Sequence, residues 1–94
     1  SLQNALPGKW TIDWGGMKWD TMLGSDGSYS AVFGKLKFVG SWTADNQGRF
    51  RITESARPDD PASWITYCVI IRSAEHPMRG CIESTKVEVQ LTRK

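Results

Sequence analysis

Residues 8–38 read GKWTIDWGGMKWDTMLGSDGSYSAVFGKLKF, and this stretch decides the fold of the chain. Apolar and polar side chains alternate along it, and turn-forming residues interrupt the alternation at 15–16, 25–27 and 34–35. Alternation with period two indicates strands that bury one face, and short turns of this kind join neighbouring antiparallel strands. The stretch therefore predicts four strands that follow one another as a meander.

Each turn implies a strand pairing that can be tested, because paired strands must present the same kind of residue on the same face. The two-residue turn Gly15-Gly16 pairs apolar with apolar residues on one face and places Asp13 opposite Lys18 on the other. The turns at 25–27 and 34–35 continue the same inward face. The predicted inward pairs are Trp14 with Met17, Ile12 with Trp19, Trp10 with Thr21, Leu23 with Tyr29, Thr21 with Ala31, Trp19 with Phe33, Phe33 with Leu36, and Ala31 with Phe38.

The rest of the chain repeats this pattern. A turn at 45–48 brings Trp42 near Phe50 and Gly40 near Ile52. Residues 55–63 contain two prolines and form the one long connection, since proline excludes a strand there. A last hairpin around Ser84-Thr85 pairs Ile82 with Val87, Gly80 with Val89, and Glu83 with Lys86. The predicted strands are 9–14, 17–23, 28–33, 36–43, 49–54, 64–72, 78–83 and 86–93.

Eight antiparallel strands with one apolar face close most economically into a barrel, because closure removes the exposed strand edges. The fold predicted for residues 1–94 is therefore all-β, a single domain in which an up-and-down meander closes into a small barrel. A flattened two-sheet sandwich is the alternative, since the same alternation serves both folds.

Composition excludes several classes of protein. The 94 residues include 12 basic and 10 acidic ones, and a net charge of +2 is too weak to indicate nucleic acid or an anionic membrane as the partner. The longest apolar run covers 67–71, too short for a membrane span, and no basic-then-apolar signal opens the chain. We expect neither a nucleic-acid nor a membrane partner.

A short pattern occurs twice along the strands. Gly8-Lys9-Trp10 and Gly40-Ser41-Trp42 are each followed by Thr, and Asp26-Gly27-Ser28-Tyr29 lies between them. This order resembles the calycin group of lipocalins, fatty-acid-binding proteins and avidins, especially short lipocalin-like bacterial domains. The resemblance implies a barrel with one closed end, where an arginine late in the last strand covers the first-strand tryptophan. Arg93 and Trp10 are the matching residues, and the arrangement is a cation–π contact.

No constellation of residues indicates catalysis, a metal or a cofactor. His76 is the only histidine and lies in the predicted loop Glu75-His76-Pro77, with no nucleophile and acid that can be matched to it. The neighbouring carboxylates Asp59 and Asp60 fit turn and capping groups better than an acid–base pair. We therefore expect a protein that is not an enzyme, with no metal site and no cofactor.

One end of the predicted barrel is a candidate mouth for a small hydrophobic ligand. The first and third turns and the long connection 55–63 all lie at this end, opposite Trp10 and Arg93. Aromatic and methionine side chains around an open end are typical of an apolar binding site. The candidate ligand-binding residues are Trp14, Met17, Phe33, Leu36, Glu54 and Ile65. The alternative is a filled barrel, because the inward aromatic side chains are large enough to leave no cavity.

The sixth predicted strand is apolar on both faces. If Ile65, Tyr67, Val69 and Ile71 point inward, an outer patch is left that consists of Trp64, Thr66 and Ile70. Exposed patches of this kind mark interfaces, so the alternative function is a protein–protein or self-association module, with a homodimer through this strand. Cover by the 55–63 connection is the other interpretation.

The two cysteines are placed by the pairing of the sixth and seventh strands. The register that sets Ile71 opposite Met78, Val69 opposite Gly80 and Tyr67 opposite Ile82 keeps these side chains inward. The same register predicts Cys68 directly opposite Cys81 on the outer face. Whether the sulfurs are bonded would depend on the compartment: a disulfide in an exported protein, and two thiols in the cytosol.

Overall fold

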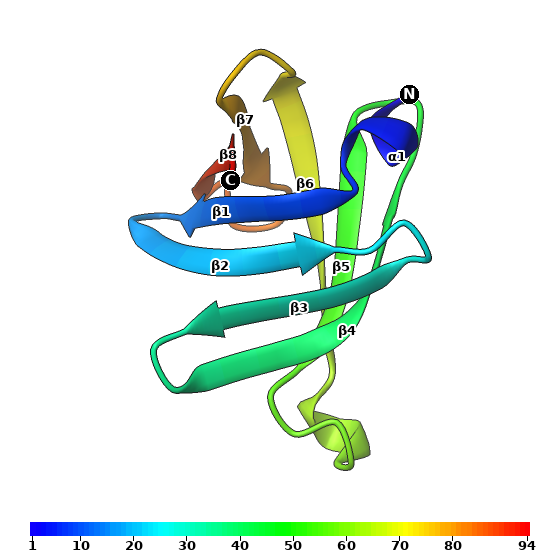
Figure 1. Ribbon diagram of the computed structural model, residues 1–94, viewed down its shortest axis with the longest axis vertical. Helices are drawn as coiled ribbons and strands as arrows, with labels where there is room; N and C mark the ends of the chain where they lie inside the picture. Colours follow the sequence, from blue (N-terminus) through cyan, green and yellow to red (C-terminus); the bar gives the residue numbers. More distant parts are fainter.

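The computed structural model describes all 94 residues and shows eight antiparallel strands in a closed barrel, each paired with its neighbours in sequence order and the last with the first (Figure 1). The predicted all-β meander is confirmed, and closure decides against the open sandwich. The strands are β1 (Gly8–Trp14), β2 (Met17–Leu23), β3 (Ser28–Phe33), β4 (Leu36–Ala44), β5 (Arg49–Ser55), β6 (Ile65–Ser73), β7 (Met78–Ile82) and β8 (Glu88–Arg93).

The predicted pairing is confirmed in the first three hairpins and in the last. Trp14 lies opposite Met17, Leu23 opposite Tyr29, and Phe33 opposite Leu36. Gly80 lies opposite Val89, although β8 begins two residues later than predicted. The first turn has the expected geometry, since both of its glycines adopt positive φ, of 60° and 106°, as a type I′ hairpin requires.

The predicted register between β4 and β5 is wrong by two residues. Ala44, not Trp42, lies opposite Phe50, and Trp42 lies opposite Ile52. The turn causes the difference, because Gly48 takes the left-handed position at φ 78° and the Asp45 carboxylate accepts hydrogen bonds from the Gln47 and Arg49 amides. A shift of two leaves every side chain on its predicted face, so Trp42 and Phe50 still touch, with ring centroids 6.0 Å apart.

The predicted register between β6 and β7 is also wrong by two residues. Cys81 lies opposite Ile70, not Cys68, and a bulge interrupts the pairing between Ile71 and Ser73. Both cysteines are free thiols. Since a shift of two keeps Val69 and Ile82 inward, the hydrophobic pattern is equally satisfied by both registers and could not select between them.

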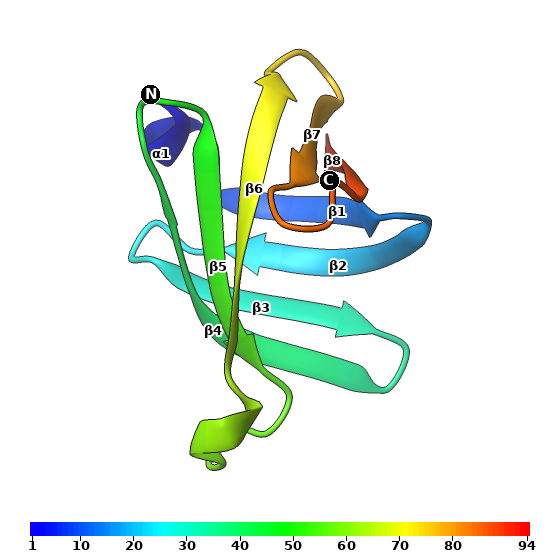
Figure 2. The same cartoon turned by 180° about the vertical axis from the view of Figure 1, so that it is seen from behind.

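Two glycines let the barrel turn its corners. β1–β3 run across the molecule, whereas β5 and β6 run along its length, and β4 bends from one direction to the other (Figures 1 and 2). Gly40 lies within β4, where a Cβ atom would come within 1.9 Å of the Thr53 carbonyl oxygen. A Cβ atom at Gly80 would likewise lie 2.1 Å from the Ile70 carbonyl oxygen. Only residues without a side chain permit such close approach between backbones.

The closed end of the barrel is plugged by a segment that periodicity did not predict. The short helix α1 (Leu2–Ala5) lies beside the ends of β4 and β5 (Figure 1), and the following Leu6 is fully buried. The buried Trp10 indole donates a hydrogen bond of 2.7 Å to the Leu6 carbonyl oxygen. A four-residue helix is too short for a hydrophobic period to be recognised.

No helix of the structure has the length and apolar character needed to span a membrane.

The Arg93 guanidinium joins the last strand to this plug. Its central carbon lies 4.0 Å from the centroid of the Trp10 ring, the contact that the family resemblance implies. Its two terminal nitrogens donate hydrogen bonds to the carbonyl oxygens of Ala5 and Pro7, at 2.6 and 3.0 Å. One side chain thus covers the tryptophan and satisfies one carbonyl group at the end of α1 and another just after it.

Replacing Arg93 with alanine is expected to lower the free energy of unfolding by roughly 1 kcal/mol or more, because a cation–π contact and two hydrogen bonds are lost together. Urea denaturation followed by tryptophan fluorescence measures the change. Arg51→Ala is the control, since this exposed arginine on β5 takes part in no ion pair. Equal stability of the two variants would count against a closing role for Arg93.

Candidate ligand-binding site

A partly open cavity of about 180 Å³ lies inside the barrel, towards the end opposite α1. Seven consecutive strands, β1 to β7, each contribute one side chain to its wall. The lining residues are, in chain order, Trp14, Trp19, Tyr29, Phe38, Glu54, Tyr67 and Ile82. The barrel is therefore not completely filled, although most of the lining side chains are large aromatic ones.

Aromatic pairs form much of the wall. Trp14 and Tyr67 are in contact at a centroid distance of 6.1 Å, with the rings inclined by 39°. The Trp19 ring packs edge-on against Phe38 at a centroid distance of 5.4 Å, and its centroid also lies 5.3 Å from that of Phe33. Such pairs are favourable beyond the area that they bury, so each ring holds its neighbour in place and the cavity keeps its shape.

Glu54 is the only charged residue in the wall, and it is 7 % exposed. Its position follows from the parity of β5, where Phe50, Ile52 and Glu54 share the inward face. The Tyr29 hydroxyl donates a hydrogen bond of 3.0 Å to Glu54 Oε1. Tyr29 and Glu54 belong to β3 and β5, on either side of β4. They can reach each other because the β4 residue opposite both of them is Gly40, which has no side chain.

Burial controls the ionisation of the polar groups in the cavity. Desolvation raises the pKa of the Glu54 carboxyl, and the hydrogen bond from Tyr29 opposes this to a smaller extent. Desolvation, followed by the charge of Glu54, raises the pKa of Tyr29 and of Tyr67 as well. Both phenols therefore stay neutral and keep a hydroxyl hydrogen to donate.

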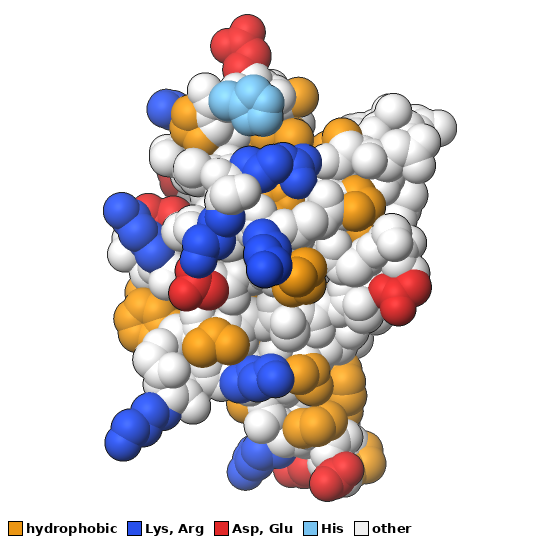
Figure 3. Space-filling view, in the orientation of Figure 1, with side chains coloured by type: hydrophobic (Ala, Val, Ile, Leu, Met, Phe, Trp, Pro, Cys, Tyr) orange, Lys and Arg blue, Asp and Glu red, His pale blue; other side chains and the backbone are white.

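The predicted ligand-binding residues divide into two groups. Trp14 and Glu54 line the cavity. The other four are exposed hydrophobic side chains that belong to strand ends beside the first and third turns and the long connection: Met17 at 45 %, Phe33 at 39 %, Leu36 at 53 % and Ile65 at 44 %. Figure 3 shows hydrophobic side chains exposed at the lower end of the molecule, where the connection between β5 and β6 lies.

Five lining residues were absent from the predicted set: Trp19, Tyr29, Phe38, Tyr67 and Ile82. The alternation of the strands places all five on the inward face, so the signal that could have identified them was present. Alternation along a strand shows only that a side chain points into the barrel. It cannot show whether that side chain is packed in the core or lines a cavity, because both positions give the same sequence pattern.

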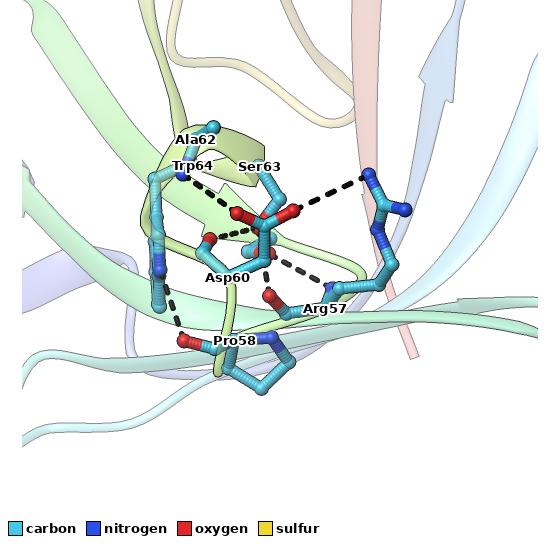
Figure 4. A network of polar contacts seen from close by, with 7 residues as sticks. Arg57, Pro58, Asp60, Ala62, Ser63 and Trp64 are labelled. Carbon is cyan, nitrogen blue, oxygen red and sulfur yellow. Dashed lines mark hydrogen bonds and ion pairs between the residues drawn. The ribbon is translucent and has the colours of Figure 1, made fainter.

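The connection between β5 and β6 is held by its own hydrogen bonds (Figure 4). Asp60 caps the short 3₁₀ helix η1 (Pro61–Ser63) by accepting from the Ala62 amide, which confirms its predicted capping role. It also lies 3.7 Å from the Arg57 guanidinium. The buried Ser55 hydroxyl accepts from the Arg57 amide at 2.9 Å and contacts the Ser63 hydroxyl. These contacts give the connection a defined shape beside the cavity.

The outer face of β6 is only partly open. The Trp64 indole is 37 % exposed and donates to the Pro58 carbonyl oxygen at 3.2 Å, so the 55–63 connection covers part of the patch (Figure 4). Thr66 is hydrogen-bonded to Thr53, and Ile70 is half-buried. Because β6 is paired on both sides, the predicted homodimer would have to form through side chains, without edge pairing of the strand.

Other sites on the molecule have different characters. A hollow of about 590 Å³ lies between α1 and the β6–β7 loop and includes Arg72, the exposed His76 and Arg93. A polar hollow of about 350 Å³ lies beside the first turn, with Asp13, Arg79 and Glu88 among its residues. Half of the ten residues of the first hollow are hydrophobic, and only one of the seven residues of the second is. No group of three or more potential metal ligands is present.

Comparison with known proteins identifies no family model, no curated protein and no solved structure that matches the chain.

Proposed function

We propose that the protein binds a small, largely apolar molecule in the cavity at the open end of its barrel, without catalysing a reaction. The observation that carries the proposal is the cavity itself: six of its seven lining residues are hydrophobic, and the seventh is Glu54. A concave apolar site with a few convergent polar groups is the usual form of a small-molecule site.

The size of the cavity limits the ligand. An apolar cavity of roughly 150 Å³ is large enough to hold benzene, so a cavity of about 180 Å³ suits a single ring with a short substituent. A larger molecule would extend past the exposed side chains of Met17, Phe33, Leu36 and Ile65, which supply apolar contact outside the mouth.

The closed barrel and its plugged end support membership of the calycin group. The barrel is closed and up-and-down, and Arg93 covers Trp10 at the plugged end, as the resemblance implies. The cavity lies at the opposite end. We propose a small lipocalin-like domain on these grounds, with a binding site scaled down to fit 94 residues.

Titration with propylbenzene, followed by isothermal calorimetry and tryptophan fluorescence, tests the proposal. We expect saturable binding, and we expect Phe38→Trp to weaken it about tenfold or more, because the larger ring fills the cavity. Met22→Trp is the control, since it adds the same ring on the exposed outer face of β2. Equal binding by both variants would contradict the proposal, and so would an unaltered protein that binds neither propylbenzene nor its amine analogue 2-phenylethylamine.

A further inference from the structure

The carboxylate of Glu54 has no positive partner within the protein. None of the four ion pairs includes it, and no lysine, arginine or histidine lines the cavity. Oε1 accepts one hydrogen bond, from Tyr29, while the structure gives Oε2 none. Buried carboxylates are normally matched by a cation or by several donors, because an unmatched charge is costly away from water. Here the unmatched group faces an open cavity.

The walls around this carboxylate are suited to a positive charge. Trp14, Trp19, Phe38 and Tyr67 all line the same cavity of about 180 Å³, so a cation inside it must lie close to aromatic rings. Ring faces attract ammonium groups electrostatically, and the attraction is strongest where water is excluded. Carboxylate and rings thus favour the same sign of charge in the ligand.

We infer that the ligand is a small organic ammonium ion, with its nitrogen paired to Glu54 and its apolar body against the aromatic wall. This inference rests on the proposed function and narrows it to one chemical class, a primary arylalkylamine or alkylamine. The N–H groups of such an ion would donate to Oε2, and the Tyr67 hydroxyl oxygen is a further acceptor in the wall.

Carboxylic acids are disfavoured by the same geometry. A carboxylate ligand would bring a second negative charge beside Glu54, with no cation in the wall to offset the repulsion. A neutral hydrocarbon would fill the apolar space but would leave Oε2 without a partner. Glu54 is only 7 % exposed, so an ammonium ion that pairs with its carboxylate displaces little water from the protein group.

The inference is tested with three probes of similar shape: 2-phenylethylamine, propylbenzene and 3-phenylpropanoate. We expect the amine to bind at least about tenfold more tightly than propylbenzene, and the carboxylate to bind most weakly, because a hydrogen bond to a charged group is worth that much or more. Calorimetry at neutral pH measures all three affinities with the unaltered protein.

Glu54→Gln keeps the size of the side chain and removes its charge. In this variant we expect the preference for amine over propylbenzene to disappear, whereas Glu83→Gln, which alters an exposed carboxylate on the outer surface, should leave it unchanged. Near-ultraviolet circular dichroism shows whether each variant keeps its aromatic packing.

A pH series provides the same information without a variant. The titratable groups that face Glu54 are Tyr29 from β3 and Tyr67 from β6, both with raised pKa values and therefore neutral below pH 7. Burial raises the pKa of Glu54 itself, so its charge is lost as the pH falls. Amine affinity should fall with it, while propylbenzene affinity should not.

The outcomes separate the two proposals. Tighter binding of the amine, with loss of the preference in Glu54→Gln or at acid pH, supports the inference. Propylbenzene binding equal to or tighter than that of the amine overturns it and leaves the apolar site standing. Failure of both molecules to bind overturns the inference together with the proposed function.

Discussion

Replacing Gly80 with alanine should destabilise the barrel by about 3 kcal/mol or more, since a single added methyl group overpacks a site formed by backbone. Its Cβ atom would lie 2.1 Å from the Ile70 carbonyl oxygen and 3.0 Å from the carbon of the same group. These atoms belong to the paired strand β6, so relief requires that the two strands separate at the corner. Guanidinium denaturation measures the loss.

Gly34→Ala is the matched control for this prediction. Gly34 lies in the third turn with φ 59°, and a Cβ atom there would meet no atom within 4 Å. Its substitution should cost only about 1 kcal/mol, the usual penalty for a left-handed residue with a side chain. If Gly80→Ala cost no more than Gly34→Ala, the close approach of β6 and β7 would be disproved.

Replacing Trp10 with alanine should cost about 3–5 kcal/mol, which is the usual range for removing a fully buried aromatic side chain. Trp10 is 0 % exposed, and its loss also leaves the buried Leu6 carbonyl without its hydrogen bond and Arg93 without the ring beneath it. A domain of this size has roughly 5–10 kcal/mol of stability in total, so thermal unfolding should begin near room temperature.

Trp14→Ala tests whether the two ends of the barrel differ as described. Trp14 is half-buried and already borders open space, so its removal enlarges an existing cavity and should cost clearly less than the loss of Trp10. Urea denaturation of both variants under one set of conditions compares them. Equal losses would contradict the division into a packed closed end and a hollow open end.

The alternation of residues was enough to predict the eight strands and the face on which each side chain lies. Turn glycines with positive φ, such as Gly15 and Gly34, marked where one strand ends and the next begins. These features are local, since side-chain direction alternates along any strand whatever its neighbours are. The inward position of Glu54 followed from the same rule, whereas the contact of Arg93 with Trp10 was expected from the resemblance to the calycin group.

Tertiary structure alone decided the β4–β5 and β6–β7 registers, which differ by two residues from the predicted ones. The partners of Phe50 and Cys81 depended on the conformation of the turn at 45–48 and on a bulge, and both alternatives keep every side chain on its face. The alternation of apolar and polar residues cannot distinguish the two registers, because the alternation itself repeats every two residues. The plug formed by α1 and Leu6 was likewise decided by packing against the finished barrel, since four residues have no period of their own.

The cavity, too, belongs to the tertiary structure. The sequence by itself determined that Tyr29, Phe38 and Glu54 point inward, but it left open whether the interior is full. That outcome depends on Gly40, which has no side chain between Tyr29 and Glu54, and on how the rings of the wall tilt against one another. Interior volume is a sum over side chains from seven strands in three dimensions, and no local pattern contains it.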